Sequence, residues 1–333
     1  MAPRALVVER VHEALPRLLE GCGVRVSEAP GATGERELEK LAPGYEVLVV
    51  RSRARVTRRV IEAGARGRLR VIARAGVGLD NIDLDAASEH GIQVVNAPTG
   101  STQSVAELTL GLMIAAARLV ALHDREVKAG VWRRRLGVEL YGKNLLVVGF
   151  GRIGRRVSEL ARAIGMRVYA YDIADVRAEA ERRGVTLVPS LCEGLSLADV
   201  VSLHVPLNRL SYHMVNRETL RCARPGVILV NTSRGAVVDA EALLEALEEG
   251  RVSAAALDVI EHEPPETEAE RILARHPRVI VTPHIGASTL EAQERVAAQL
   301  ATRILEALGV ECREAAEARA RLCDTLKGQG LHC

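Results

Sequence analysis

The sequence predicts an α/β protein built on two parallel β-sheets, each covered by helices on both faces. Across the first hundred residues, short buried runs of β-branched residues alternate with helical patterns, as in parallel strands joined by crossover helices. A second strand–helix–strand series begins at residue 144 and contains a glycine-rich turn. Because 333 residues suffice for two domains, we expect two doubly wound domains.

The first sheet is expected to contain strands separated by helices. The predicted strands are residues 5–8, 47–50, 71–73 and 93–95, and the predicted helices are residues 11–20, 57–63 and 84–90. Arg51-Ser52-Arg53 follows one of these strands, and Arg74–Gly78 includes the end of the next. Since ligands of open parallel sheets bind at the carboxyl ends of the strands, these two loops are candidate binding sites.

A long apolar helix is predicted to begin at Ser104. Ser104-Val105-Ala106-Glu107 has the form of a capping box, in which the serine accepts a free backbone N–H and the glutamate reaches back. The helix is expected to run to Arg118. Because it is apolar nearly all round, we expect it to be buried on several sides.

The second series carries a dinucleotide-binding pattern. A strand, Asn144–Val148, leads into Gly149-Phe150-Gly151-Arg152-Ile153-Gly154 and a helix through Ile164, and a further strand ends at Asp172. The glycines permit a tight turn and close approach to a pyrophosphate, which the helix N-terminus attracts. Asp172 would bind the adenosine ribose and repel the 2′-phosphate of NADP, so NAD is the predicted cofactor. Arg177, five residues on, could weaken that repulsion.

Composition excludes several classes of function. A net charge of +2 and few aromatic residues argue against a nucleic-acid binder. The longest uncharged apolar stretch, residues 108–117, is too short to span a bilayer, so no membrane contact is expected. The six cysteines are widely spread with no C-x-x-C pair, which predicts free thiols in a reducing compartment. With no hydrophobic leader at the start, the prediction is a cytoplasmic protein.

Seven strings in the sequence resemble the D-isomer-specific 2-hydroxyacid dehydrogenase family. They are Val50–Ser52, Arg74–Asp83, Gly149–Gly154, His204–Leu207, Asn231–Gly235, Leu257–Val259 with Glu263-Pro264, and Thr282–Thr289. They occur in family order over roughly residues 5–308. The resemblance is strongest to the members that oxidise 3-phosphoglycerate.

The resemblance implies a catalytic set of Arg234, Glu263 and His284. Oxidising a 2-hydroxy acid requires a base for the hydroxyl proton, and histidine suits this role. Glu263 would orient the imidazole and favour its charged form, and Arg234 would bind the substrate carboxylate. The alternatives to these choices are Glu261 for the acid and His262 or His276 for the base. No histidine pair has helical ligand spacing beside a carboxylate, so no metal is expected.

The resemblance also implies further cofactor contacts, and the residues that follow two strands of the first sheet predict the substrate contacts. The predicted NAD contacts are Val77, Gly149, Gly151, Arg152, Ile153, Gly154, Asp172, Val205, Thr232, Ser233, Asp258 and Gly286, with Asp258 accepting from the nicotinamide amide. The predicted substrate contacts are Arg51, Arg74 and Gly76. These arginines favour an anionic, phosphorylated substrate. The alternative is that Arg74 pairs with Asp80 or Asp83 and that Arg51 is a solvated strand end.

For the architecture, the resemblance implies a Rossmann NAD-binding domain, residues 99–285, inserted into a flavodoxin-like substrate domain made of residues 1–98 and 286–333. A homodimer is expected. The run from Trp132 to Gly137 is shorter than in relatives, which puts in doubt any reach of its arginines into a neighbouring site. The chain leaves no room for a C-terminal regulatory domain, so feedback control by serine is not expected.

Three functions follow as alternatives. The first is an NAD-dependent dehydrogenase that converts 3-phosphoglycerate to 3-phosphohydroxypyruvate, a step of serine biosynthesis. The second keeps the chemistry but acts on glyoxylate or hydroxypyruvate. The third, from another class, is an NAD-sensing corepressor that keeps the fold and works by binding partners.

Overall fold

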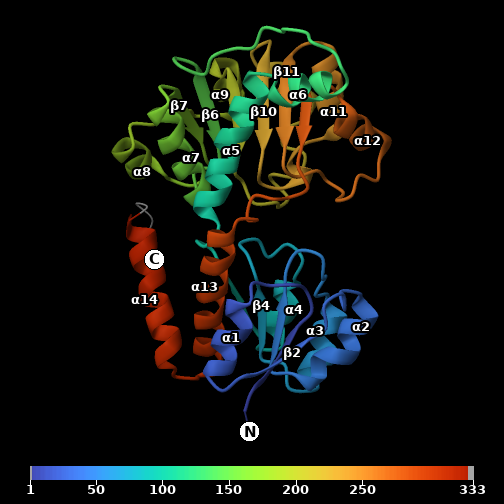
Figure 1. The fold of residues 1–333 in the computed structure, drawn as a ribbon, viewed down its shortest axis with the longest axis vertical. Coiled ribbons are helices and arrows are strands. Elements are labelled where there is room, and N and C mark those ends of the chain that lie inside the picture. The colour runs from blue at the N-terminus through green and yellow to red at the C-terminus, as the bar shows by residue number, and fades with distance from the viewer. Residues whose placement is uncertain (1, 329–333) are drawn as a thin grey trace. The chain divides into compact units, whose positions relative to one another are not determined.

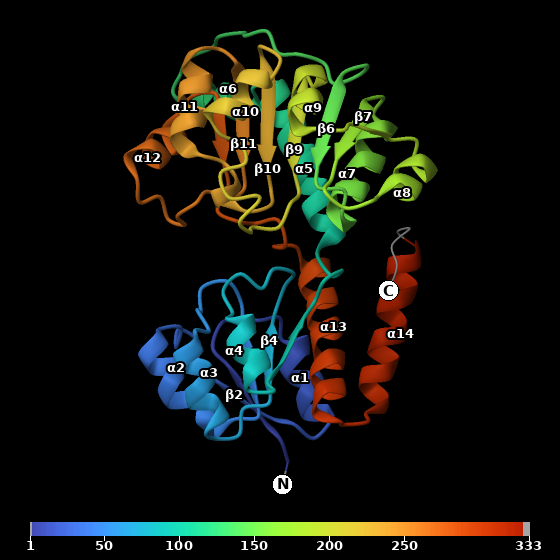
Figure 2. The same cartoon turned by 180° about the vertical axis from the view of Figure 1, so that it is seen from behind.

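The structure is a computed structural model, and it describes residues 2–328. The chain forms two compact units (Figures 1 and 2). One unit takes in the residues up to Ser101 together with those from Ala287 onward, and the other is Thr102–Gly286. Each unit is built around one parallel sheet, which confirms the predicted α/β class.

The first unit has a five-stranded sheet in the order β2-β1-β3-β4-β5. Its strands are β1 (Arg4–Val7), β2 (Arg25–Glu28), β3 (Val47–Val50), β4 (Val71–Arg74) and β5 (Gln93–Asn96). Its helices are α1 (Ala14–Gly21), α2 (Glu35–Leu41), η1 (Ala42–Gly44), α3 (Arg58–Ala65), α4 (Leu84–Glu89), α13 (Leu290–Leu308) and α14 (Arg313–Gly328). Alternate strand residues point to opposite faces. Ala5 and Val7 pack against α1 and α13, and Leu6 packs on the face that α2, α3 and α4 cover.

The second unit has a seven-stranded sheet in the order β12-β11-β10-β9-β6-β7-β8. Its strands are β6 (Asn144–Val148), β7 (Arg167–Tyr171), β8 (Thr186–Leu187), β9 (Val200–Leu203), β10 (Val227–Asn231), β11 (Val252–Leu257) and β12 (Val279–Val281). Its helices are α5 (Thr102–Ala117), α6 (Val120–Lys128), α7 (Arg152–Ala163), α8 (Arg177–Arg182), α9 (Leu191–Leu197), α10 (Arg217–Cys222), η2 (Gly235–Val237), α11 (Ala240–Glu248) and α12 (Glu268–Arg275).

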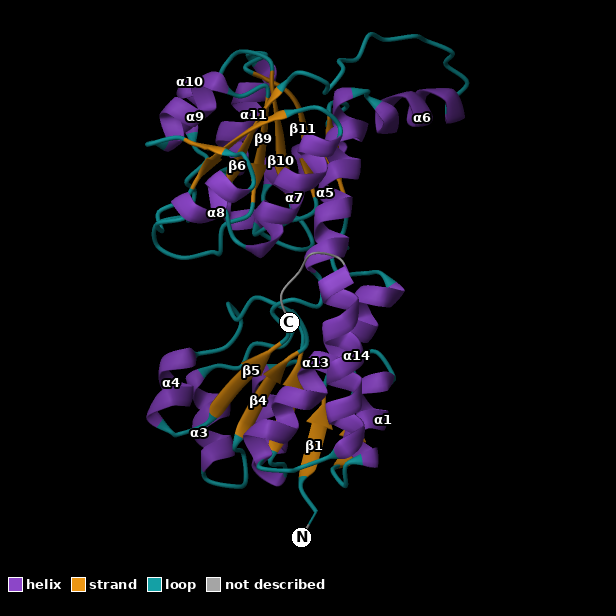
Figure 3. Ribbon diagram, turned by 90° about the vertical axis from the view of Figure 1, so that its left-hand side faces the viewer, coloured by secondary structure: helices purple, strands orange, loops and turns teal. Residues whose placement is uncertain are grey.

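Helices cover both faces of this second sheet. The helices α5, α7 and α8 pack on one face, and α9, α10, α11 and α12 pack on the other; Figure 2 shows this unit from behind and Figure 3 shows it from the side. The strand order reverses between β6 and β9, because β7 and β8 continue from one and β10 to β12 from the other. In such sheets the ligand crevice lies at this reversal, next to the turn that follows β6.

The apolar helix α5 starts two residues before the predicted position. It begins at Thr102, so Ser104 lies inside its first turn and is buried rather than capping it. Glu107 is exposed and accepts a hydrogen bond from the Gln103 side chain at 2.5 Å. The predicted capping box was therefore wrong, whereas the predicted burial on several sides is confirmed by buried residues spread around the helix.

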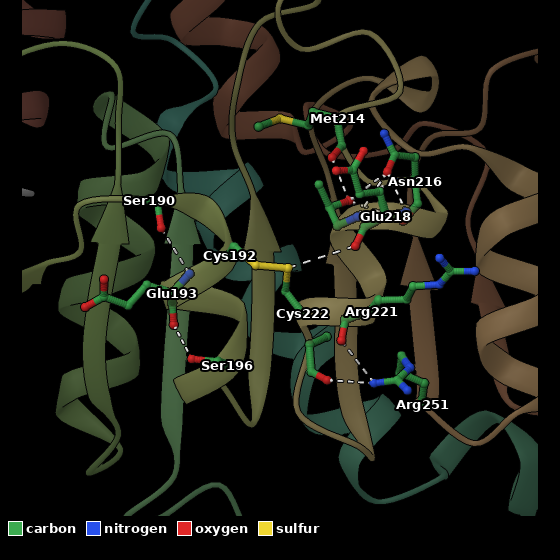
Figure 4. Close-up of a disulfide and its surroundings, with 12 residues drawn as sticks. Ser190, Cys192, Glu193, Ser196, Met214, Asn216, Glu218, Arg221, Cys222 and Arg251 are labelled. Carbon is green, nitrogen blue, oxygen red and sulfur yellow. Dashed lines mark hydrogen bonds between the residues drawn. A yellow bond between two sulfur atoms is a disulfide. The ribbon is translucent and has the colours of Figure 1, made fainter.

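Free thiols were predicted, and the structure corrects this. Cys22 is bonded to Cys312, with Cα atoms 5.6 Å apart, and Cys192 of α9 is bonded to Cys222 of α10, with Cα atoms 5.2 Å apart (Figure 4). None of the cysteines in the described residues is free, and Cys333 lies outside them. The folding of the chain brings these partners together over sequence separations of 290 and 30 residues. One premise of the predicted cytoplasmic location is thereby removed.

Within residues 2–328, no single helix is long and apolar enough to cross a membrane. The pair α5 and α6, bent by 64° at the break between them, meets that criterion on length and composition alone.

Candidate active site

Three neighbouring strands of the second sheet carry the predicted catalytic residues just beyond their ends. Arg234 follows β10, Glu263 follows β11 and His284 follows β12. These strands are parallel and adjacent, so their carboxyl ends lie at the same edge of the sheet. The fold therefore carries all three loops to one edge.

His284 and Glu263 are in direct contact. The imidazole Nδ1 lies 2.9 Å from Glu263 Oε2, and the two side chains are 36% and 40% exposed. The alternative residues have other partners. Glu261 contacts His213 Nε2 at 2.8 Å, and His262 Nδ1 contacts Glu270 at 3.0 Å. The structure thus pairs Glu263, not Glu261, with His284.

The backbone of His284 is held in an unusual conformation. Its φ of +55° lies in the left-handed region, which residues other than glycine rarely adopt. Its N–H lies 2.9 Å from the carbonyl oxygens of both Asp258 and Thr282. Backbone strain of this kind persists where the surrounding contacts enforce it, and it concentrates at functional sites.

Asp258 fixes the loop that carries His284. It is 1% exposed, and its carboxylate accepts hydrogen bonds from Thr282 Oγ1 at 2.6 Å and from the N–H groups of Ile285 and Gly286 at 2.8 Å. The sequence assigned Asp258 only a contact to nicotinamide, which stays a prediction. Its role in shaping the histidine loop was missed, because the partners lie 24 to 28 residues away.

The turn that carries Arg234 is organised by a buried amide. Asn231 Oδ1 accepts from the N–H and the hydroxyl of Ser233, and its Nδ2 donates to the carbonyl of Arg234 at 2.9 Å. A Cβ on Gly235 would overlap the backbone of Ile260, so only glycine permits this approach. This contact brings the Arg234 turn against the loop that leads to Glu263.

The glycine-rich turn has the shape that a dinucleotide requires. Gly149 has a φ of +92°, and a Cβ there would lie 2.8 Å from the backbone of His204. A Cβ on Gly154 would overlap the carbonyl of Gly149, whereas Gly151 faces open space. Arg152 and Ile153 begin α7, so their N–H groups belong to the helix N-terminus that attracts a pyrophosphate.

Asp172 is anchored beside this turn. Its carboxylate accepts from the N–H of Phe150 at 2.7 Å and from that of Ala174 at 2.9 Å, so it is held next to the glycine-rich turn. The Arg177 guanidinium forms two bonds to Asp175, at 3.1 and 3.2 Å. Arg177 is thus paired with Asp175, which favours NAD over NADP.

The remaining predicted cofactor residues of this unit lie at neighbouring strand ends. Val205 packs on the core beyond β9, and Thr232 and Ser233 are nearly buried beyond β10. Gly286 is buried, and a Cβ there would lie 3.2 Å from Asp258 Oδ2. His204, next to Val205, is a poor candidate base because burial lowers its pKa to about 3.

In the first unit, Arg51 and Arg74 stand at the ends of the paired strands β3 and β4. Arg51 is not a simple solvated strand end, because its guanidinium donates to the carbonyl of Arg10 at 3.0 Å. The side chain of Arg74 folds against Gly76, whose φ is +150°.

The loop after β4 makes two further contacts. The carbonyl of Val77 accepts a hydrogen bond from the Asn96 side chain at 2.6 Å. Asp83 caps α4 through the N–H of Ala86.

Glu9 occupies the backbone cradle of the Arg51 loop. It is only 9% exposed, and its carboxylate accepts from the N–H groups of Arg51 at 2.6 Å and of Arg53 and Ala54 at 3.1 Å. Converging N–H groups of this kind form an anion site. In this chain its own carboxylate fills that site, so an external anion would have to be bound by side chains.

The described residues contain no group of three or more His, Cys, Asp or Glu side chains that could hold a metal ion.

Comparison with known proteins points to a dehydrogenase family. Residues 110–286 match the model of the D-isomer specific 2-hydroxyacid dehydrogenase NAD binding domain.

Two similar relatives have different names. One is D-3-phosphoglycerate dehydrogenase of Methanocaldococcus jannaschii, 46% identical over 313 residues that cover 93% of this chain and 58% of the relative. The other is hydroxypyruvate reductase of Thermotoga maritima, 47% identical over 276 residues that cover 82% and 88%. The chain thus spans little more than half the length of the first relative and most of the second.

Solved structures agree with this match. D-lactate dehydrogenase from Aquifex aeolicus, in complex with NAD and lactic acid, has a TM-score of 0.81 and 30% identity, covering 94% of this chain and 97% of that one. These comparisons confirm both the resemblance that the seven strings indicated and the predicted fold class.

Proposed function

Because the chain belongs to the D-isomer specific 2-hydroxyacid dehydrogenase family, we propose that it catalyses the reversible, NAD-dependent oxidation of a D-2-hydroxy acid. The observation that carries the proposal is the hydrogen bond between His284 and Glu263, at the edge of the sheet where the Arg234 turn also lies. An acid–base group and a cation at one edge of an NAD-binding domain suit this reaction.

His284 would move the substrate proton. Because Nδ1 faces the Glu263 carboxylate, Nδ1 holds a proton and Nε2 is left to accept the hydroxyl proton of the substrate. The charged imidazolium that results lies beside a carboxylate, which stabilises it. In the reverse direction the same imidazolium protonates the oxygen of the reduced product.

Arg234 would bind the substrate carboxylate. A guanidinium matches a carboxylate with two parallel hydrogen bonds, and it also stabilises negative charge on the reacting oxygen. The turn built on Asn231 and Gly235 fixes the backbone from which this side chain extends. The substrate would thus be held by its carboxylate while His284 acts on its hydroxyl.

The residues of the glycine turn fit NAD. Gly151 leaves open space beside the start of α7, and Asp172 presents an anchored carboxylate. When bound, NAD supplies the hydride acceptor of the reaction. We propose that Val205, Thr232, Ser233, Gly286 and the Val77 loop complete its contacts, as the sequence predicted.

For the substrate, we propose 3-phosphoglycerate. Arg51 and Arg74 follow neighbouring strands, and two guanidinium groups suit a phosphate dianion. With Glu9 filling the backbone cradle, these side chains would carry the recognition. The M. jannaschii relative is named for this activity. The name of the T. maritima relative supports the second candidate, hydroxypyruvate or glyoxylate.

A panel of substrates tests the proposal. NADH formation is measured at 340 nm with 3-phosphoglycerate, D-glycerate, glycolate and D-lactate, and NADH consumption is measured with their 2-oxo acids. We expect the largest kcat/KM for the 3-phosphoglycerate pair. Binding of NAD without turnover of any member would instead favour a cofactor-sensing binding protein.

We also propose that the protein forms a homodimer through the outer surface of α6 and the segment that follows it. Trp132 is 81% exposed and Leu136 is 99% exposed, and Val127, Val131 and Val138 are also exposed. Large apolar side chains gathered along one stretch of the surface mark a protein interface. A second copy of the chain carries the same apolar side chains, so two copies could cover this surface by a self-complementary contact.

Replacing Trp132 and Leu136 together by Asp is expected to convert the dimer to a monomer. Two buried charges at an interface cost more than the apolar contacts that they replace. Sedimentation velocity should report the mass of one chain, 35.9 kDa, for the variant and twice that for the wild type. Leu290→Asp, at a residue that is 77% exposed outside this surface, should stay dimeric. A wild type that sediments as a monomer would contradict the proposal.

A further inference from the structure

The loop between β11 and α12 carries Glu263 and is closed by one buried carboxylate. Glu270, in the first turn of α12, is 1% exposed. Its Oε1 accepts from the N–H of His262 at 2.9 Å and lies 3.0 Å from the imidazole Nδ1 of the same residue. Its Oε2 accepts from the N–H groups of Glu266 and Thr267, both at 2.9 Å.

These contacts lie on both sides of Glu263. His262 precedes it directly, and Glu266 and Thr267 follow after Pro264 and Pro265. One side chain therefore ties together the two ends of a three-residue segment. The backbone of Glu270 is itself held, because the Thr267 hydroxyl accepts the N–H of Glu270 at 3.2 Å in a capping box.

The carboxylate of Glu270 remains charged in the folded protein. Burial alone would raise its pKa, but the N–H groups of Thr267, His262 and Glu266 and the His262 imidazole lower that pKa to about 2. The same contact raises the pKa of His262. Because the folded pKa lies below the ordinary value, the stabilisation by Glu270 is complete above about pH 4.5 and is lost as the pH falls toward 2.

Glu263 needs such support. It is 40% exposed, and an exposed carboxylate–imidazole pair stabilises a loop only weakly by itself. A carboxylate that orients a catalytic histidine must nevertheless stay in place through the reaction. The support has to come from the backbone on either side of Glu263.

We propose that Glu270 is a positioning residue: it fixes the backbone on both sides of Glu263 and thereby keeps the Glu263 carboxylate on Nδ1 of His284. This inference rests on the proposed dehydrogenase function. The capping-box pattern Thr267-x-x-Glu270 marks the residue in the sequence, although its contact to His262 follows only from the fold.

Glu270→Gln tests the proposal, with Glu268→Gln as the matched control. Glu268 lies in the same helical turn and is exposed, and its replacement by Gln removes the same charge as Glu270→Gln does. Glu270→Gln is expected to lower kcat/KM for 2-oxo acid reduction by about 10- to 100-fold. Glu263→Gln should show a loss of the same kind, because it removes the carboxylate from His284 Nδ1 directly. Glu268→Gln should match the wild type in kcat/KM.

A double-mutant cycle separates positioning from a general structural role. In the Glu263→Gln background, Glu270→Gln should add less than about a threefold loss, because there is no longer a carboxylate to place. An equal loss in both backgrounds would overturn the proposal. If Glu270→Gln does not fold, Glu270→Asp replaces it, because this variant keeps the charge but has a shorter side chain. Its kcat/KM is then compared in the wild-type and Glu263→Gln backgrounds, with the same expected results.

Amide hydrogen exchange gives a readout that does not depend on turnover. In Glu270→Gln, exchange at His262, Glu266 and Thr267 should become at least about tenfold faster, and the Nδ1 proton signal of His284 should broaden or disappear. Both should be unchanged in Glu268→Gln. Unchanged exchange and an intact His284 signal in Glu270→Gln would overturn the inference. Absence of dehydrogenase activity in the wild type would overturn the proposed function alone.

Discussion

His284→Ala is expected to lower kcat for D-2-hydroxy acid oxidation by about 10²- to 10⁴-fold, which is the usual contribution of a general acid–base group. NADH binding should be nearly unchanged, because the imidazole faces Glu263 and is separate from the glycine turn that begins α7. Steady-state kinetics give the first quantity, and NADH fluorescence titration gives the second.

His276→Ala is a suitable control for this variant. His276 precedes β12, so it lies at the opposite end of that strand from His284, and its Nδ1 accepts the N–H of Arg278 at 3.2 Å. It should retain most of the wild-type kcat. A loss below about tenfold for His284→Ala would show that another group accepts the proton.

Arg51→Ala and Arg74→Ala are each expected to raise KM for 3-phosphoglycerate by about 10- to 150-fold. This range corresponds to a loss of roughly 1.5–3 kcal/mol for a hydrogen bond to a charged group. A phosphate-free substrate such as D-glycerate should show little change in KM. The measurement is a pair of kinetic titrations with the two substrates for each variant.

Arg70→Ala provides the control for charge. Arg70 is exposed and directly precedes β4, whereas Arg74 ends it, so its removal changes net charge equally at the other end of the strand. We expect no change in KM with either substrate. Equal losses on both substrates in Arg51→Ala and Arg74→Ala would mean that these arginines bind the carboxylate or support the fold, and the case for a phosphorylated substrate would lose its physical basis.

The parts of the fold that could be predicted are those with a strong local signal. Buried apolar runs marked β3 and β6, and the glycine pattern marked the turn before α7. The strand β2 was missed because it is an edge strand with polar residues, and its ends, Arg25 and Glu28, are exposed. The charged helix α2 was missed for a similar reason, since Leu38 is its one buried residue.

In the site, three roles were missed: Asp258 was predicted only as a cofactor contact, and Glu9 and Glu270 were not predicted as site residues. Asp258, Glu270 and Glu9 are each nearly buried, and each accepts several backbone N–H groups from a loop that bears a predicted site residue. The sequence shows an acidic residue in each case, but it does not show which loop supplies the N–H groups that the carboxylate accepts. The paired cysteines were missed for the same reason, because their proximity exists only in the folded chain.

The bond between Cys22 and Cys312 has a consequence for the covalent connectivity of the whole chain. The unit that contains both cysteines is made of two stretches of sequence, and the entire second unit lies between them along the chain. Residues 22–312 therefore form a closed covalent ring. A protease that cuts once anywhere in the ring produces two peptides that migrate together until a reductant is added. The terminal stretches of the first unit thus remain one molecule even after the unit inserted between them has been opened.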